Sequence, residues 1–149
     1  MLKTKKQIKS WLDKYEITDY TINDDLSVDV DGCVSLSYKN LTEIPVQFNK
    51  VNGNFRCYNN KLTSLVGSPK EVKGDFHCSS NQLTSLVGAP KEVNGDFYCS
   101  NNQLTSLEGS PKKVFGYFYC YNNKLTSLEG APKEVNGIFE CFNNQLTSL

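Results

Sequence analysis

Long apolar runs, an excess of charge of one sign and a secretion signal are all missing from this sequence. Its longest apolar stretches span only a few residues, which excludes a transmembrane helix of about 20 residues. The 149 residues include 16 basic and 16 acidic side chains, so no net field draws the chain to nucleic acid or to an anionic membrane. The basic segment 1–6 is not followed by an apolar segment. We therefore expect a soluble protein that stays in the cytoplasm where it is made.

Residues that carry chemistry are also sparse. The six cysteines include no closely spaced C-x-x-C pair of the kind that binds zinc. His77 is the single histidine, and its neighbour Cys78 should point to the opposite face, so a Cys–His nucleophilic pair is not expected. The acidic segment 24–31 lacks the spacing of a calcium loop, which favours turn and strand residues instead. We expect no enzyme, no metal and no cofactor.

A 21-residue unit fills most of the chain: V-x-G-x-F-x-C-x-x-N-x-L-T-S-L-x-G-x-P-K-x. A weaker copy comes first, five copies follow, and the last is partial. The units begin at Val30, Val51, Val72, Val93, Val114 and Val135. The chain accordingly divides into an N-terminal cap, residues 1–29, and a repeat solenoid, residues 30–149.

The segment F-x-C-x-x-N-x-L of each unit predicts a strand followed by a bend. Phe55 and Cys57 alternate with polar residues, which is the period of a strand with one buried face. In a parallel stack, equivalent residues form ladders roughly 4.8 Å apart. The repeated asparagine, Asn60 in the first strong unit, should satisfy backbone groups at the bend. Gly67 and Pro69 should return the chain through a short irregular or 3₁₀ segment.

The unit F-x-C-x-x-N-x-L-T-S-L-x-G-x-P-K-x-V-x-G resembles the short leucine-rich repeats encoded by bacteriophages and prophages. The front end, with Trp11-Leu12 and Tyr15, followed by Val28–Gly32, is similar to the N-terminal cap of that group. The resemblance covers essentially the whole chain. It implies a horseshoe with a parallel β-sheet on its concave face, a viral or prophage origin and action inside a bacterial host. It implies no catalytic residues.

The two ends of the solenoid are expected to differ. Thr4 and Gln7 form a capping-box pattern, and Ile8, Trp11 and Leu12 lie on one apolar helical face. This helix, with a strand or hairpin near 20–22 and 26–30, should cover the first repeat. The chain stops at Leu149, part-way through a repeat. A truncated chain, self-association through that edge and a partner that covers it all stay open.

Outward-facing strand positions vary from repeat to repeat, which marks them as surface. Aromatic and apolar side chains gather there towards the C-terminal half, whereas Asp75 and Asp96 give the earlier repeats a polar rim. Tyrosine-rich clusters are typical of protein interfaces, although tyrosine also suits exposed strands. The candidate protein-binding residues are Arg56, Tyr58, His77, Tyr98, Tyr117, Tyr119, Tyr121, Ile138 and Phe142.

Other repeated positions have plainer interpretations. The cysteine ladder is interpreted as structural thiols, and Cys33, which lies outside it, is expected to be the thiol most reactive to a probe. A lysine column interleaved with glutamates predicts a solvated edge rather than a phosphate track. This column comprises Lys70, Lys91, Lys112 and Lys133.

These patterns favour a protein-binding module over a catalyst. The expected partner is a host bacterial protein, which a phage accessory protein would inhibit or redirect, as in anti-defence. The alternative is a structural protein that forms a homodimer or larger assembly through its C-terminal edge. Nucleic-acid and membrane partners are not expected.

Overall fold

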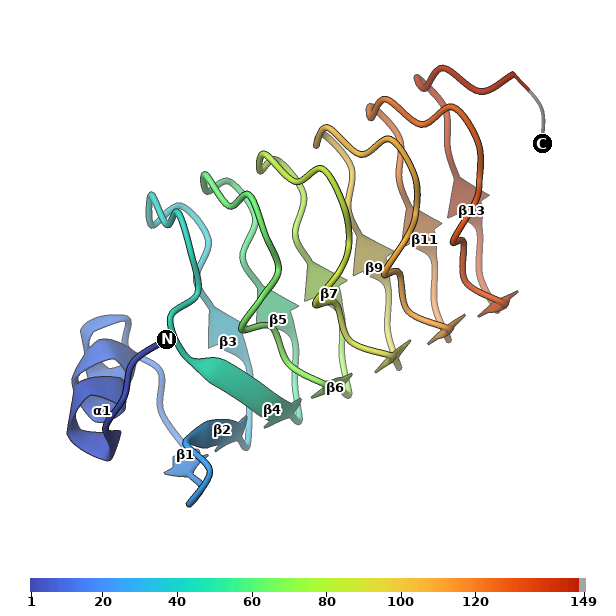
Figure 1. The fold of residues 1–149 in the computed structure, drawn as a ribbon. Helices are drawn as coiled ribbons and strands as arrows, with labels where there is room; N and C mark the ends of the chain where they lie inside the picture. Colours follow the sequence, from blue (N-terminus) through green and yellow to red (C-terminus); the bar gives the residue numbers. More distant parts are fainter. Residues whose placement is uncertain (148–149) are drawn as a thin grey trace.

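Each turn of the chain contributes one short strand to each of two parallel sheets. The computed structural model describes residues 1–147 and shows a mostly-β solenoid with a single helix at its N-terminal end (Figure 1). Sheet A comprises β1 (Tyr20–Ile22), β2 (Ser27–Val30), β4 (Gln47–Val51), β6 (Glu71–Val72), β8 (Glu92–Val93), β10 (Lys113–Val114) and β12 (Glu134–Val135). Sheet B comprises β3 (Val34–Ser35), β5 (Phe55–Arg56), β7 (Phe76–His77), β9 (Phe97–Tyr98), β11 (Phe118–Tyr119) and β13 (Phe139–Glu140).

The 21-residue spacing fixes the register of the stack. Phe55 pairs with Phe76 in parallel strands, and Phe76 pairs with Phe97, so identical positions lie directly above one another. Their rings stack nearly parallel, with centroids 5.5 and 5.3 Å apart, and the three side chains are fully buried. This phenylalanine column, lined by the leucines and valines of each unit, forms the core.

The repeated asparagines close each turn, as the sequence predicts. Asn102 donates from Nδ2 to the carbonyl oxygens of Cys99 (3.1 Å) and Cys78 (3.2 Å). Its Oδ1 accepts a hydrogen bond from the backbone N–H of Leu83 at 3.1 Å. One side chain thus satisfies three backbone groups on two neighbouring turns. The same bonds recur at Asn81 and Asn123.

The return segment differs from the irregular or 3₁₀ path expected from the sequence, because it carries the strands of sheet A. Glu71–Val72 pairs with Glu92–Val93 in register, just as the strands of sheet B do. Horseshoe curvature is not shown: the turns in Figure 1 follow one another along a nearly straight line. Parallel strands on both sides impose the same rise of roughly 4.8 Å per turn, and equal rise on two sides produces no arc.

The N-terminal segment covers the first turn, as predicted. Helix α1 (Lys5–Lys14) begins after Thr4, whose Oγ1 accepts a hydrogen bond from the backbone N–H of Gln7 at 3.1 Å. Its apolar face buries Ile8 and Leu12 in the core. Strand β1 pairs with β2 antiparallel and completes the cap. Within residues 1–147, no helix has the length and hydropathy needed to cross a membrane.

Candidate protein-binding surface

The outward positions of sheet B form the surface that the sequence singles out. In the sheet B strands β5, β7, β9 and β11, the first residue is a buried phenylalanine and the second faces out, half-buried. The register therefore aligns these second residues into one column. We call the outward set the tyrosine face. It comprises Arg56, Tyr58, His77, Tyr98, Tyr117, Tyr119, Tyr121, Ile138 and Phe142.

The aromatic rings of the tyrosine face form one continuous array. The His77 ring lies 4.2 Å from the Tyr58 ring and 4.5 Å from the Tyr98 ring, centroid to centroid. Tyr98 stacks on Tyr119 at 4.8 Å with 16° between the ring planes. The array continues from Tyr119 through Tyr121 to Phe142, and Tyr117 packs edge-on against Tyr119. The structure thus joins all seven aromatic candidates, counting His77, into one contiguous surface.

The stacking determines which parts of the rings a ligand meets. Because rings 4.2–4.8 Å apart cover one another's faces, the column formed by Tyr58, His77, Tyr98 and Tyr119 has no gap for an inserted base or sugar. Its edges and hydroxyl groups face outward instead. The Tyr98 hydroxyl donates to Asp96 at 3.0 Å, and burial, followed by this bond, raises the pKa of Tyr98. Because this column has no gaps between its rings, the surface suits a flat contact.

His77 is held neutral within the array. Burial, and to a lesser extent the positive charge of Arg56, lower the pKa of His77 to about 4, although Asp75 acts in the opposite direction. The neighbouring Cys78 is fully buried, and burial raises its thiol pKa well above the ordinary value. Its Sγ lies 3.3 Å from the carbonyl oxygen of Tyr98, as a donor. The pair on opposite faces of β7 has no arrangement for nucleophilic chemistry.

The column that precedes the strands has a structural role that the sequence reasoning missed. Asn54 Oδ1 accepts a hydrogen bond from the backbone N–H of Asp75 at 2.7 Å, and Asp75 Oδ1 accepts from Asp96 at 2.8 Å. Asp96 Oδ1 accepts from Tyr117 at 2.7 Å. Asp75 and Asp96, the residues of the expected polar rim, thus each use one carboxylate oxygen to accept a backbone hydrogen bond. At Tyr117 the pattern stops, and the side chain is 41% exposed.

Tyr38 extends the tyrosine face and was not among the candidates. It is 71% exposed and packs edge-on against Tyr58, with ring centroids 5.5 Å apart. Its φ of +58° places it in the left-handed region, where the following repeats have Asn59 and Ser80. A bulky residue is uncommon in this conformation. The signal in the sequence was a tyrosine at the bend position where later repeats have asparagine or serine, but the candidates came from outward strand positions alone.

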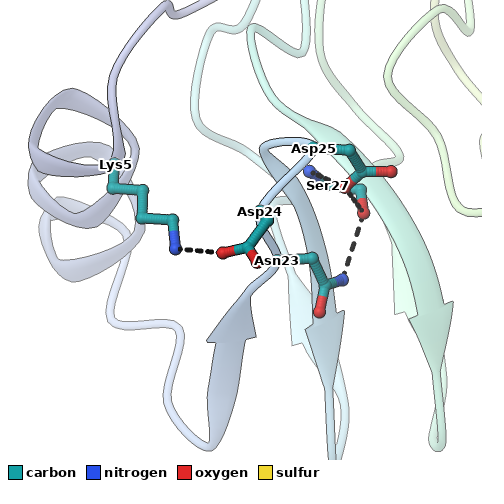
Figure 2. Close-up of polar contacts among 5 residues, drawn as sticks. All are labelled: Lys5, Asn23, Asp24, Asp25 and Ser27. Carbon is teal, nitrogen blue, oxygen red and sulfur yellow. Dashed lines mark hydrogen bonds and ion pairs between the residues drawn. The ribbon is translucent and has the colours of Figure 1, made fainter.

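The remaining chemical candidates take structural roles. The cysteines are free: Cys33 is exposed, and four members of the ladder are buried, as predicted. In the turn between β1 and β2, Asp25 accepts hydrogen bonds from the Ser27 hydroxyl (2.6 Å) and backbone N–H (3.0 Å), while Lys5 pairs with Asp24 at 3.1 Å (Figure 2). The acidic segment thus consists of this turn and strand β2, and residues 1–147 contain no group of side chains placed to hold a metal ion.

Compared with known protein families, curated proteins and solved structures, the chain matches none of them. The class that the fold defines is a parallel β-solenoid with a repeat of 21 residues and a helical N-terminal cap.

Proposed function

We propose that the chain is a protein-binding module whose tyrosine face contacts a partner protein. The observation that carries the proposal is the uninterrupted aromatic array from Tyr58 to Phe142. Two members of the array, Tyr117 and Phe142, expose 41% and 54% of their surface, and Ile138 of the same face exposes 53%. Such residues supply a large contact area at low entropic cost, and the tyrosine hydroxyls add directional hydrogen bonds.

The geometry favours a protein over a small ligand. The rings are already packed against one another, so binding needs little further ordering of side chains, which lowers the entropic cost of association. Three grooves of residues 1–147 are lined by other parts of the surface, and none of their lining residues belongs to the tyrosine face. Arg56 in β5 and Glu140 in β13 stand on either side of His77, Tyr98 and Tyr119 in the outward column and provide one charge of each sign.

A finer part of the proposal concerns origin. We propose that the chain is a short leucine-rich-repeat protein of the phage and prophage kind, which binds and inhibits or redirects a host protein in the bacterial cytoplasm. The motif F-x-C-x-x-N-x-L supports this part, as does the asparagine that satisfies backbone groups of two neighbouring turns. The proposal includes an anti-defence role, in which the inhibited host protein belongs to a bacterial defence system.

Affinity capture from a bacterial lysate with matched variants tests the proposal. We expect the wild-type chain to retain one stoichiometric protein that Tyr119→Asp loses. Phe115→Asp is the control, because it places the same charge on a side chain 41% exposed beside sheet A. Loss of a central interface aromatic typically costs about 2 kcal/mol or more, roughly a thirtyfold rise in Kd. Circular dichroism checks that both variants fold.

Light scattering of the purified chain distinguishes the protein-binding proposal from the competing proposal of self-assembly. The protein-binding proposal predicts one mass across concentrations in the absence of a partner. A concentration-dependent dimer that Tyr119→Asp leaves intact, together with no protein captured selectively by the wild-type chain, would contradict it.

A further inference from the structure

An asparagine followed by a glycine stands at the same corner of three turns, where the chain passes from sheet A to sheet B. All three asparagines are exposed, and each follows the valine that ends a strand of sheet A. The pairs are Asn52 with Gly53, Asn94 with Gly95, and Asn136 with Gly137. A glycine leaves its backbone nitrogen unhindered for attack on the preceding side-chain amide, because it has no side chain. The local sequence therefore gives the three pairs the same reactivity.

The backbone hydrogen bonds of the three glycines differ. Gly95 and Gly137 each donate their N–H to the glycine carbonyl oxygen of the preceding turn, at 2.9 Å in both cases. Within residues 1–147, the N–H of Gly53 makes no corresponding bond to the carbonyl oxygen of Gly32 or of any other residue. The structure thus distinguishes one of three pairs that are alike in sequence.

The first turn departs from the repeat at the position where this bond is missing. Gly32 has a φ of +156°, whereas the equivalent glycines of the later turns are not among those with positive φ. The pairing of β2 with β4 also shifts register between Val28 and Val30, just before this corner. The regular ladder of glycine bonds begins only at Gly53, whose carbonyl oxygen accepts from the N–H of Gly74 at 3.0 Å. The Gly53 nitrogen therefore lacks the bond that holds its equivalents in place.

We propose that Asn52 is a site of spontaneous deamidation, selected among the three pairs by the unbonded N–H of Gly53. Water or hydroxide removes the proton from the Gly53 nitrogen, which then forms a bond to Cγ of Asn52. The bond between Cγ and Nδ2 breaks, and the nitrogen takes up a proton from water and leaves as ammonia. Water opens the resulting succinimide ring at either carbonyl carbon, which leaves aspartate or isoaspartate at position 52.

The product changes the contact between the N-terminal cap and the first strong repeat. Asn52 donates from Nδ2 to Asp31 Oδ1 at 3.2 Å. Deamidation replaces this donor by a carboxylate oxygen, which repels the Asp31 carboxylate. Isoaspartate also adds one atom to the backbone, next to the Asn52 N–H that donates to the carbonyl oxygen of Val30 at 3.0 Å. The modification therefore weakens the junction between β2 and β4, and it is independent of the tyrosine face.

Incubation of the full chain at mildly alkaline pH, followed by peptide mass spectrometry, tests the proposal. We expect Asn52 to convert about three- to tenfold faster than Asn94 and Asn136, because at those two sites the hydrogen bond of the next glycine must first break. In urea the three rates should converge, since all three sites share the sequence valine–asparagine–glycine. The unfolded chain thus controls for sequence, and Asn94 and Asn136 are matched controls within the folded chain.

Two further measurements separate the unbonded N–H from the neighbouring carboxylate. Amide hydrogen exchange followed by NMR should show Gly53 exchanging faster than Gly95. Asp31→Ser removes the acceptor of the Asn52 side chain and should leave Asn52 the fastest of the three sites. The proposal is overturned if Asn94 or Asn136 converts as fast as Asn52 in the folded chain, or if the Gly53 amide exchanges no faster than that of Gly95. It is also overturned if Asp31→Ser lowers the rate at Asn52 to that at Asn94.

Discussion

Replacing Asn102 by alanine tests the physical basis of the stack. The substitution removes hydrogen bonds of 3.1, 3.2 and 3.1 Å to Cys99, Cys78 and Leu83. It leaves the N–H of Leu83 without a partner in a site where the Asn102 side chain is 8% exposed. The carbonyl oxygens of Cys99 and Cys78 each keep one hydrogen bond, from Asn123 and Asn81. An unpaired buried N–H costs roughly 1–3 kcal/mol, and each of the two lost hydrogen bonds about 0.5–1.5 kcal/mol. We therefore expect the free energy of unfolding to fall by about 2–6 kcal/mol, a large share of the 5–15 kcal/mol typical of a domain.

Urea unfolding followed by circular dichroism measures this loss. The matched control is Gln103→Ala, at the neighbouring exposed position, where a surface substitution should change stability by no more than about 0.5 kcal/mol. A loss below about 1 kcal/mol for Asn102→Ala would refute the reasoning, because water would then be replacing the amide at little cost.

Three further predictions concern single side chains. At pH 8, Cys33 should react with a thiol reagent in the folded protein. Cys57 should react only after unfolding, because burial raises its pKa to about 12. Equal reaction rates for the two thiols would contradict this prediction. His77 should titrate near pH 4 by NMR in the folded protein, whereas the unfolded chain takes up that proton near pH 6.5. The free energy of unfolding should therefore fall as the pH drops from about 6.5 to about 4, and it should fall less in His77→Phe. Tyr38→Asn should leave thermal stability unchanged or raise it by about 1 kcal/mol, because asparagine tolerates positive φ; a clear loss would show that its contact with Tyr58 outweighs the backbone strain.

The elements that the sequence predicts best are those with a repeated, one-sided pattern. Phe97 and Cys99 alternate with outward residues, and Asn102 recurs at one position of every strong unit, so the strand and its bend could be placed before the structure. The cap helix was equally predictable, because Ile8 and Leu12 follow helical spacing. The tyrosine face followed from the same register, which fixes which side chains point out.

The second sheet was harder to predict for a physical reason. From β5 onward, the strands of both sheets are only two residues long. In sheet B, however, the buried Phe97 is followed two positions later by the buried Cys99, whereas Val93 is the only buried residue of β8 and lies between Pro90 and Gly95. The sheet A segment therefore reads as a turn. The second sheet also determines the shape of the solenoid, because an equal rise per turn on both sides of the stack leaves no horseshoe curvature. Tyr38 was missed because it stands in the bend, at the position of Asn59 and Ser80, and so was not counted among the outward strand positions.

Site-directed photo-crosslinking tests the central claim most directly. A photoreactive phenylalanine is placed at Phe142 on the tyrosine face or at Phe115 beside sheet A, two positions 54% and 41% exposed that start from the same residue type. In bacterial cells, the account predicts one discrete adduct at Phe142, of the mass of the captured protein, and none at Phe115. An adduct of the same mass at Phe115 alone, or equal adducts at both positions, would contradict the claim that the tyrosine face binds the partner.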